Sequence, residues 1–177
     1  MNALPAIHWP LAVAAAAMLA ACAGDAAPLA TVAHVELARF MGDWRVIGNI
    51  PTFIERDAYN AVESYRLEPD GSIATTFTFN KGGFDGPQKR HTPRGFVLDS
   101  RTNATWGMRF VWPVKADYRI IYLTPDYSVT VIGRAARDYL WIMAREAHIS
   151  EDAWQAAVAA AAAAGYDTTK INKVPQA

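Results

Sequence analysis

The chain has 177 residues, enough for one domain, and 52% of them are hydrophobic, which is sufficient for a packed core. Basic and acidic residues each number 17, so the formal net charge is +0. No basic field is available to gather phosphates, which argues against nucleic-acid binding. Charged residues make up only 19% of the chain, below the usual quarter, which favours an envelope or ligand-binding protein.

An apolar run over 9–21 ends in Leu19-Ala20-Ala21-Cys22. It has the length of a signal-peptide core and is too short to span a membrane. Its last four residues resemble the lipobox of bacterial lipoproteins, so we expect residues 1–21 to be a signal peptide and Cys22 to carry lipid. The first eight residues contain no Lys or Arg, which departs from a typical signal. A plain secretory signal with an incidental cysteine is the alternative.

The residue after Cys22 is Ala23, which in lipoproteins of this type favours the outer membrane. Acyl chains at about 0.8 kcal/mol per buried methylene would anchor the protein firmly. We therefore expect a lipid-anchored domain that faces the periplasm. The composition of 22–35 indicates a flexible tether, which leaves 36–177 as the folded domain. Cys22 is the only cysteine, so an intrachain disulfide is impossible.

Short β-prone runs alternate with turn residues from Asp43 onward. Pro51 ends the first run, and Pro69-Asp70-Gly71 marks a hairpin. Pro93 lies inside the fourth run and predicts a bulge or an edge position. Eight strands at spacings of roughly 8–15 residues are typical of β-sandwiches and β-barrels. The predicted strands are 44–50, 59–67, 72–79, 88–98, 104–112, 118–124, 128–134 and 139–145.

One helix is predicted after the strands. Ser150 is a good N-cap, residues 153–164 are almost all helix formers, and Gly165 is a typical stop. Trp154 and Val158 lie four residues apart and share one face. The run lacks the basic face of a membrane-surface helix, so we expect it to pack on the β-domain.

Five segments in order resemble the lipocalin family, and specifically its bacterial outer-membrane lipocalin and apolipoprotein D branch. The first is Phe40-Met41-Gly42-Asp43-Trp44, which matches the Gly-x-Trp signature. The others are 50–52, the Thr-Pro-Asp-Tyr of 124–127, the Tyr-Leu-Trp-Ile-Met-Ala-Arg of 139–145, and the helix with its tail to 171. A lone Gly-x-Trp is weak evidence, whereas five segments over most of 40–175 are specific.

The resemblance implies an all-β fold, an eight-stranded antiparallel up-and-down β-barrel with one C-terminal α-helix packed on it. It implies that Gly42 and Trp44 begin the first strand at a closed end, where the Arg145 guanidinium covers the Trp44 indole. A cation over an indole face is worth roughly 0.5–2 kcal/mol. Such a plug makes the barrel a cup. The lack of disulfides fits the bacterial members.

Strand alternation predicts which side chains line this cup. If Arg145 points inward, the alternate residues of its strand point inward too. Arg109 is charged, so it and the residues in phase with it on its strand are expected to face solvent, and the residues between them to face the interior. The resemblance to apolipoprotein D points to the positions of Tyr65, Phe77 and Trp141. The predicted hydrophobic cup is lined by Tyr65, Phe77, Phe79, Met108, Phe110, Trp112, Trp141 and Met143. A barrel simply filled by these side chains is the alternative.

Glu63 shares the inward parity of Tyr65, which is costly for a carboxylate without a partner or water. It would bond a polar ligand group, turn outward at a bulge, or lie in a wet site near the rim; we favour the last two. Further charges could flank the mouth and meet a phosphate headgroup, although ordinary solvation explains any one of them. They are Lys81, Lys89, Arg90 and, in a loop after Trp112, Lys115 and Asp117.

The expected function is binding of a small hydrophobic ligand, a fatty acid or lysophospholipid, for lipid storage, transport or envelope maintenance. A chain of about 16 carbons offers on the order of 10 kcal/mol of transfer free energy before costs. Flat-ring ligands such as a tetrapyrrole, isoprenoid or quinone would also suit an aromatic cup. A filled barrel that binds a protein partner, with a homodimer as one form, is the second reading.

A lipocalin-type enzyme is the third reading. The four histidines, His8, His34, His91 and His148, are spread along the chain. No Ser/His/Asp arrangement, cysteine nucleophile or metal-ligand spacing emerges from the sequence. We therefore predict no catalytic residue, no metal site and no cofactor.

Overall fold

The computed structural model describes residues 28–111 and 113–177. The predicted signal peptide, Cys22 and Trp112 lie outside these residues. The elements are α1 (Leu37–Phe40), β1 (Gly42–Ile50), β2 (Ala58–Leu67), β3 (Ile73–Lys81), β4 (Gln88–His91), β5 (Arg94–Val97), β6 (Thr105–Val111), β7 (Val114–Leu123), β8 (Val129–Gly133), β9 (Leu140–Ala144), α2 (Glu151–Ala163), the 3-10 helix η1 (Thr168–Lys170) and β10 (Asn172–Lys173).

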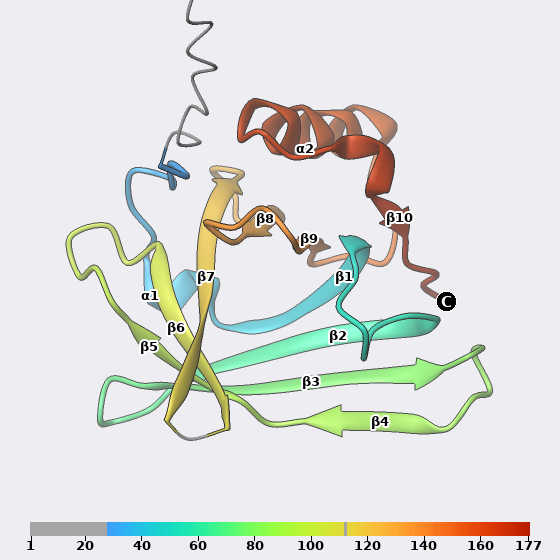
Figure 1. The fold of residues 1–177 in the computed structure, drawn as a ribbon, viewed down its shortest axis with the longest axis horizontal. Helices are drawn as coiled ribbons and strands as arrows, with labels where there is room; N and C mark the ends of the chain where they lie inside the picture. Colours follow the sequence, from blue (N-terminus) through green and yellow to red (C-terminus); the bar gives the residue numbers. More distant parts are fainter. Residues whose placement is uncertain (1–27, 112) are drawn as a thin grey trace, which may run out of the picture.

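The strands form one antiparallel sheet that closes on itself (Figure 1). Around the barrel, β1, β2, β3, β5, β6, β7, β8 and β9 lie side by side in chain order, and β9 pairs with β1 to complete the ring. Closure gives these strands neighbours on both sides, which is how an up-and-down barrel protects its backbone hydrogen bonds, whereas β4 lies off the ring and pairs with β3. The predicted eight-stranded up-and-down barrel with one main helix is confirmed.

The predicted strand 88–98 is broken in two by Pro93. Its first part, β4, pairs with β3, and its second part, β5, carries the sheet on to β6. A proline nitrogen cannot donate to the ladder, whereas its carbonyl still accepts from the Thr75 N–H at 3.2 Å. The irregularity expected at Pro93 is therefore a strand break.

Lys115 and Asp117 were expected in a loop after Trp112, but both lie within β7, which begins at Val114. Lys115 lies on the outer face, where its Nζ is 4.4 Å from the centre of the Phe96 ring. Asp117 pairs with Arg119 at 3.0 Å.

The tether predicted for 22–35 is too long, because its second half packs on the barrel. Leu29 is 4% exposed and Val35 is fully buried. The N–H of Val32 donates to the Ile120 carbonyl at 3.0 Å, and that of Val35 to the Thr102 carbonyl at 2.8 Å. Apolar side chains spaced three apart give this segment a buried face, so any free tether ends before Leu29.

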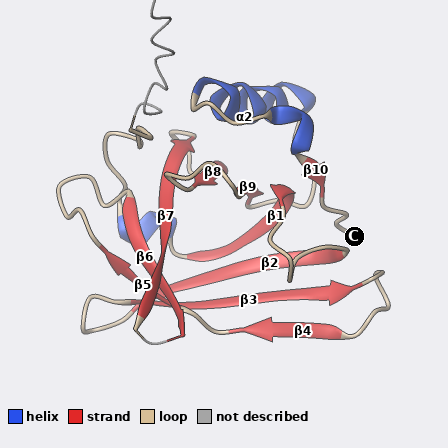
Figure 2. Cartoon of the chain, viewed as in Figure 1, coloured by secondary structure: helices blue, strands red, loops and turns tan. Residues whose placement is uncertain are grey.

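Two apolar cores share the wall of the barrel. One fills the barrel interior, and the other lies between β7–β9 and α2, which Figure 2 shows as the one long helix outside the sheet. The Ser150 hydroxyl accepts from the Ala153 N–H as predicted for an N-cap, and Ala157 and Ala161 are fully buried. Helix packing on the barrel is thus observed. In the described part of the chain, no helix is long and apolar enough to cross a membrane.

Candidate functional site

One end of the barrel is closed by Arg145. Its guanidinium carbon lies 3.8 Å from the centre of the Trp44 ring, and its Nη1 donates to the Asp43 carbonyl at 2.8 Å. Its Nη2 donates to three further backbone carbonyls, those of Arg39, Phe40 and Met41. An always-charged fork with several donors is suited to such a site. This contact turns the barrel into a cup.

Gly42 allows the approach of Arg145. Its φ is +92°, in the region that favours glycine, and an added Cβ would lie 3.4 Å from Arg145 Nη1. The short helix α1 completes the closed end and places Phe40, fully buried, 5.0 Å from the Trp44 ring.

The lower part of the barrel is filled by aromatic side chains. Phe40 packs edge-on against Trp106, with ring centres 5.4 Å apart, and Trp106 stacks on Tyr118 at 5.1 Å. Tyr65 packs edge-on against both Trp106 and Tyr118. These contacts leave the closed end solid and confine open space to the upper barrel.

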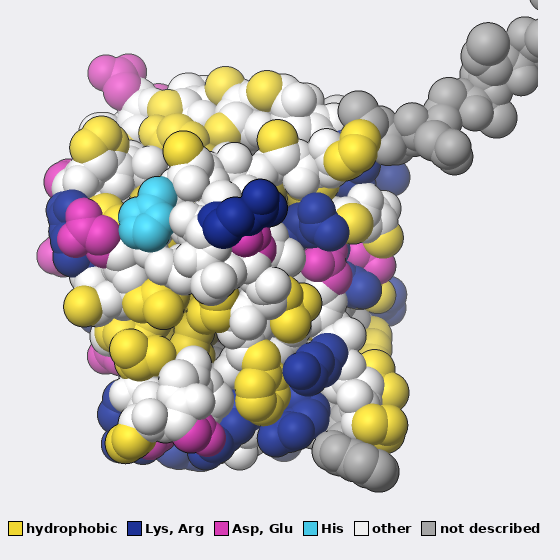
Figure 3. Space-filling view, turned by 90° about the vertical axis from the view of Figure 1, so that its left-hand side faces the viewer, with side chains coloured by type: hydrophobic (Ala, Val, Ile, Leu, Met, Phe, Trp, Pro, Cys, Tyr) yellow, Lys and Arg dark blue, Asp and Glu magenta, His cyan; other side chains and the backbone are white. Residues whose placement is uncertain are grey.

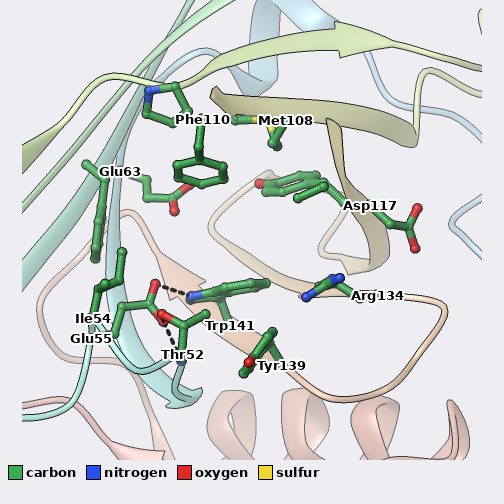
Figure 4. A pocket seen from close by; sticks show the side chains of 14 residues that line it. Thr52, Ile54, Glu55, Glu63, Met108, Phe110, Asp117, Arg134, Tyr139 and Trp141 are labelled. Atoms are coloured by element: carbon green, nitrogen blue, oxygen red, sulfur yellow. Dashed lines mark hydrogen bonds between the residues drawn. The ribbon is translucent and has the colours of Figure 1, made fainter. Parts of the chain in front are cut away.

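The upper barrel holds a cavity of about 100 Å³ (Figure 4), which we call the cup. Its apolar and aromatic lining comes from the strands and three connections between them: Ile54, Phe77, Pro93, Met108, Phe110, Ala116, Tyr118, Tyr139 and Trp141. Its polar lining is Thr52, Glu55, Glu63, Asp117 and Arg134. Aromatic walls with a few convergent polar groups are typical of small-molecule sites.

The structure separates the predicted cup residues by depth. Phe77, Met108, Phe110 and Trp141 line the cup. Phe110 is 56% exposed and forms part of the rim, because the β6–β7 register shifts between Met108 and Val111. Three others are buried in the core without lining the cavity: Tyr65, Phe79 and Met143. Trp112 lies outside the described residues.

Several lining residues come from loops, which strand parity could not reach. Thr52, Ile54 and Glu55 lie between β1 and β2. Glu55 is only 6% exposed and accepts three hydrogen bonds: from the Trp141 indole at 2.9 Å, the Thr52 N–H at 2.9 Å and the Thr52 hydroxyl at 3.0 Å. The sequence does mark this loop, through the resemblance of segment 50–52 to the lipocalin family, but that resemblance does not identify Glu55 as a lining residue.

Glu63 faces the cup, so of the two readings favoured from the sequence, the outward turn at a bulge is wrong. The β2–β3 register does shift, between Tyr59 and Val62, but it shifts before Glu63 and leaves the inward parity intact. The Tyr65 hydroxyl donates to the Glu63 carboxylate and lies 2.7 Å from the Tyr118 hydroxyl. Three polar groups are thus linked on the cup floor.

Burial changes the protonation of this floor. Desolvation, with a smaller contribution from the nearby Glu55 charge, raises the pKa of Glu63 from 4.5 to about 8. Burial and then the Glu63 charge raise the pKa of Tyr118 well above its usual value. Glu63 is therefore mainly neutral at pH 7, so its carboxyl group can donate one hydrogen bond while it accepts another from the Tyr65 hydroxyl.

The charges at the mouth are largely paired. Arg134 bonds Asp138 at 3.1 Å, and Asp117 pairs with Arg119. Of the five charges expected at the mouth, Asp117 alone appears in the cup lining. Lys81, Lys89 and Arg90 lie on the β3–β4 hairpin, which extends away from the barrel in Figure 1. The face seen in Figure 3 intersperses basic, acidic and hydrophobic side chains.

The histidines do not gather at the cup. The His34 ring bonds the Arg101 carbonyl, His91 stacks near Phe79, and His148 lies beside α2. Across 28–111 and 113–177, no group of three or more His, Cys, Asp or Glu side chains could hold a metal ion. The cup therefore offers shape, apolar surface and hydrogen bonding.

Comparison with known proteins assigns this chain to a family. The family model described as "Lipocalin-like domain" matches residues 35–176. Temperature-induced lipocalin-1 of Arabidopsis thaliana is 31% identical over 157 residues, covering 82% of this chain and 81% of its own. Outer membrane lipoprotein Blc of Escherichia coli K12 is 27% identical over 180 residues, covering 99% and 98%. Insecticyanin of the tobacco hornworm Manduca sexta shares the fold, with a TM-score of 0.65 at 12% identity over 81% of this chain and 82% of its own. The chain belongs to the lipocalin family, as a relative of the bacterial outer-membrane lipocalins.

Proposed function

We propose that the protein binds a small hydrophobic molecule in the cup, with a fatty acid or a lysophospholipid as the leading ligands. The observation that carries this proposal is the aromatic cavity of about 100 Å³ above a closed floor. Burying apolar surface there contributes roughly 25 cal/mol per Å². Family membership supports the same class of function, because lipocalins typically bind ligands.

The size of the cavity limits what it holds without rearrangement. Ligand pockets usually measure roughly 300–1,000 Å³, so a cavity of about 100 Å³ takes one ring or the end of a chain. Phe110 at the rim is exposed, so a rotation of its side chain would widen the mouth without disturbing the core. A longer acyl chain would then extend past it, with its polar head in solvent.

The same proposal places the protein in the envelope. The lipobox-like Leu19-Ala20-Ala21-Cys22 and the relatives named as outer membrane lipoproteins support a lipid on Cys22 and an outer-membrane anchor facing the periplasm. Lipid storage, transport or envelope maintenance are roles that suit a tethered cup.

Metabolic labelling tests the lipid anchor. Labelling cells with a palmitate analogue should mark the wild-type protein and fail to mark the Cys22→Ser variant.

Intrinsic tryptophan fluorescence tests ligand binding. Trp141 lines the cup and should respond to occupancy, so a lysophospholipid or fatty acid should give a saturable change with micromolar or tighter affinity. Phe77→Ala should weaken binding while the fold is retained. Trp154→Phe, on the helix outside the barrel, is the matched control and should keep it. A folded protein that responds to no amphiphile would refute the proposal.

A second candidate is a nearly filled barrel that binds a protein. The solid lower barrel and small cavity favour it, as do Phe53 at 78% and Phe110 at 56% exposure. In that case the apolar mouth would be a contact surface, for another protein or a second copy of this chain. A concentration-dependent mass in sedimentation, abolished by Phe53→Ser, together with no ligand response, would support it.

A further inference from the structure

Two glutamates face the interior of the cup, and Glu63 adds its charge to that of Glu55 as the pH rises through about 8. Glu55 is 6% exposed and is satisfied by three uncharged donors, two from Thr52 and one from Trp141. Glu63 bonds the Tyr65 hydroxyl. Among the described residues, neither carboxyl takes part in an ion pair. A buried carboxylate of this kind favours a positively charged partner.

The charged groups at the mouth do not supply that partner. Arg134 lines the cup, but its guanidinium is paired with Asp138 at 3.1 Å and lies over the Tyr139 ring. Asp117 is paired with Arg119. The charges at the mouth are therefore close to balanced, whereas the inner wall carries the charge of Glu55 and the floor becomes negative when Glu63 loses its proton. An anionic headgroup placed deep in the cup would be repelled by Glu55.

The walls around these carboxyls suit an organic cation. Glu55 and Glu63 both point into the space bordered by Trp141 and Phe110 (Figure 4). A cation near an aromatic face gains roughly 0.5–2 kcal/mol, and an ammonium donates strong charge-assisted hydrogen bonds to carboxylates. Phe77 and Tyr118 complete an apolar enclosure for the rest of such a molecule.

The volume restricts the occupant to a compact molecule. A dry cavity of about 150 Å³ is enough for benzene, and the cup is of comparable size at about 100 Å³. A cavity below that size encloses the charged head, a short arm and part of one ring, and the rest of the ring lies at the rim beside the exposed Phe110.

We propose that the cup takes a small amine head-first, with its ammonium between Glu55 and Glu63 and its apolar body against Trp141 and Phe77. This inference rests on the proposed function and deepens it, because it names a ligand class for the same cavity. Fatty acids and lysophospholipids would enter the same cup tail-first, with the head at the mouth.

The proposal predicts a dependence on pH. Glu63 is faced by Glu55 from the β1–β2 loop, Tyr65 on its own strand and Tyr118 on β7; the other titratable groups nearby are Asp117, Arg134 and, behind Phe77, His91. Because burial holds the pKa of Glu63 near 8, Glu63 gains its charge between pH 7 and 9, where an alkylammonium stays protonated. Amine affinity should rise about tenfold from pH 6 to 9, with release of a proton on binding near pH 7.

Calorimetry with three probes of the same ring and similar length tests this: 2-phenylethylamine, 2-phenylethanol and 3-phenylpropionate. At pH 8 the amine should bind at least tenfold more tightly than the alcohol, and the acid least tightly. Glu63→Gln should abolish the rise of amine affinity with pH. Glu151→Gln, on the exposed start of α2, removes a carboxylate of the same charge and should leave the affinity for the amine and its rise with pH as in the wild type.

The wild-type comparison alone can overturn the inference, whether or not the variants fold. An amine that binds no more tightly than the alcohol would do so, as would an amine preference that stays flat with pH and survives Glu63→Gln. If the three probes fail while a lysophospholipid still saturates the Trp141 signal, this inference fails and the proposed function stands. If no amphiphile binds at all, both fail.

Discussion

Glu63 carries a carboxyl that folding moves from water into the cup. Its folded pKa of about 8 lies above the ordinary 4.5, so from pH 4.5 to 8 the unfolded chain has lost a proton that the folded chain keeps. Stability therefore falls as pH rises through that window, and the penalty is complete above pH 8. We expect Glu63→Gln to raise the free energy of unfolding by on the order of 1–3 kcal/mol at pH 8.5 and by little at pH 4.

Urea unfolding of both proteins at pH 4, 6 and 8.5 measures this effect. The difference between variant and wild type should grow with pH, whatever other groups titrate. An equal difference at pH 4 and 8.5 would show that Glu63 does not titrate as its burial implies.

Arg145 is the residue on which the closed end depends. Lysine has one compact ammonium, which cannot bond four carbonyls and cover the Trp44 face at once. We expect Arg145→Lys to cost about 2 kcal/mol of unfolding free energy, the size of a lost hydrogen bond to a charged group. Arg109→Lys, which alters a cation over Phe96 at 4.7 Å on the outer face, is the control and should cost less than about 0.5 kcal/mol.

Equal losses for the two arginine variants would mean that the closed end contributes no more than a surface contact. A large loss confined to Arg145→Lys would show that the carbonyl contacts and the Trp44 stacking act together.

At the scale of elements, α2 is docked through a close contact between Gly48 of β1 and Trp154. A Cβ on Gly48 would lie 2.6 Å from one ring carbon of Trp154 and 2.9 Å from another. Gly48→Ala should therefore displace the helix and cost roughly 1–3 kcal/mol. Gly83→Ala adds the same methyl group where nothing lies within 4 Å and should be close to neutral. Thermal unfolding compares the two, and a Gly48→Ala protein as stable as the Gly83→Ala protein would contradict this docking.

The strands could be predicted from the sequence because turn residues and alternation are local signals. The break at Pro93 follows from the missing N–H. The helix α1 could not be predicted, since four residues carry no period, and the packing of 28–35 depends on a barrel surface formed by distant residues. The start of β7 was missed because charged residues on the outer face of a strand look like a loop.

The lining of the cup could be predicted only in part, because it too depends on contacts between residues far apart in the chain. Alternation identified Phe77, Met108 and Trp141 as inward. It could not say that Tyr65 and Met143 lie in the filled part, because depth depends on how side chains pack. Nor could it reach the loop residue Glu55, which has no strand parity to follow.

At the scale of the whole molecule, the barrel is divided into a solid closed half and an open half. Arg145 and the Phe40–Trp106 cluster hold the first, and the second ends at the exposed Phe110. The central claim is that the cavity in the open half is where ligand binds.

Blocking that cavity tests the claim most directly. Ala116 lines the cup, and Ala116→Phe adds a ring to a space of about 100 Å³; Ala156→Phe makes the same change on an exposed position of α2. With affinities measured by calorimetry for a lysophospholipid, we predict at least a tenfold loss for Ala116→Phe and none for Ala156→Phe, with both proteins folded. Wild-type affinity in the Ala116→Phe protein would place the ligand elsewhere and contradict the account.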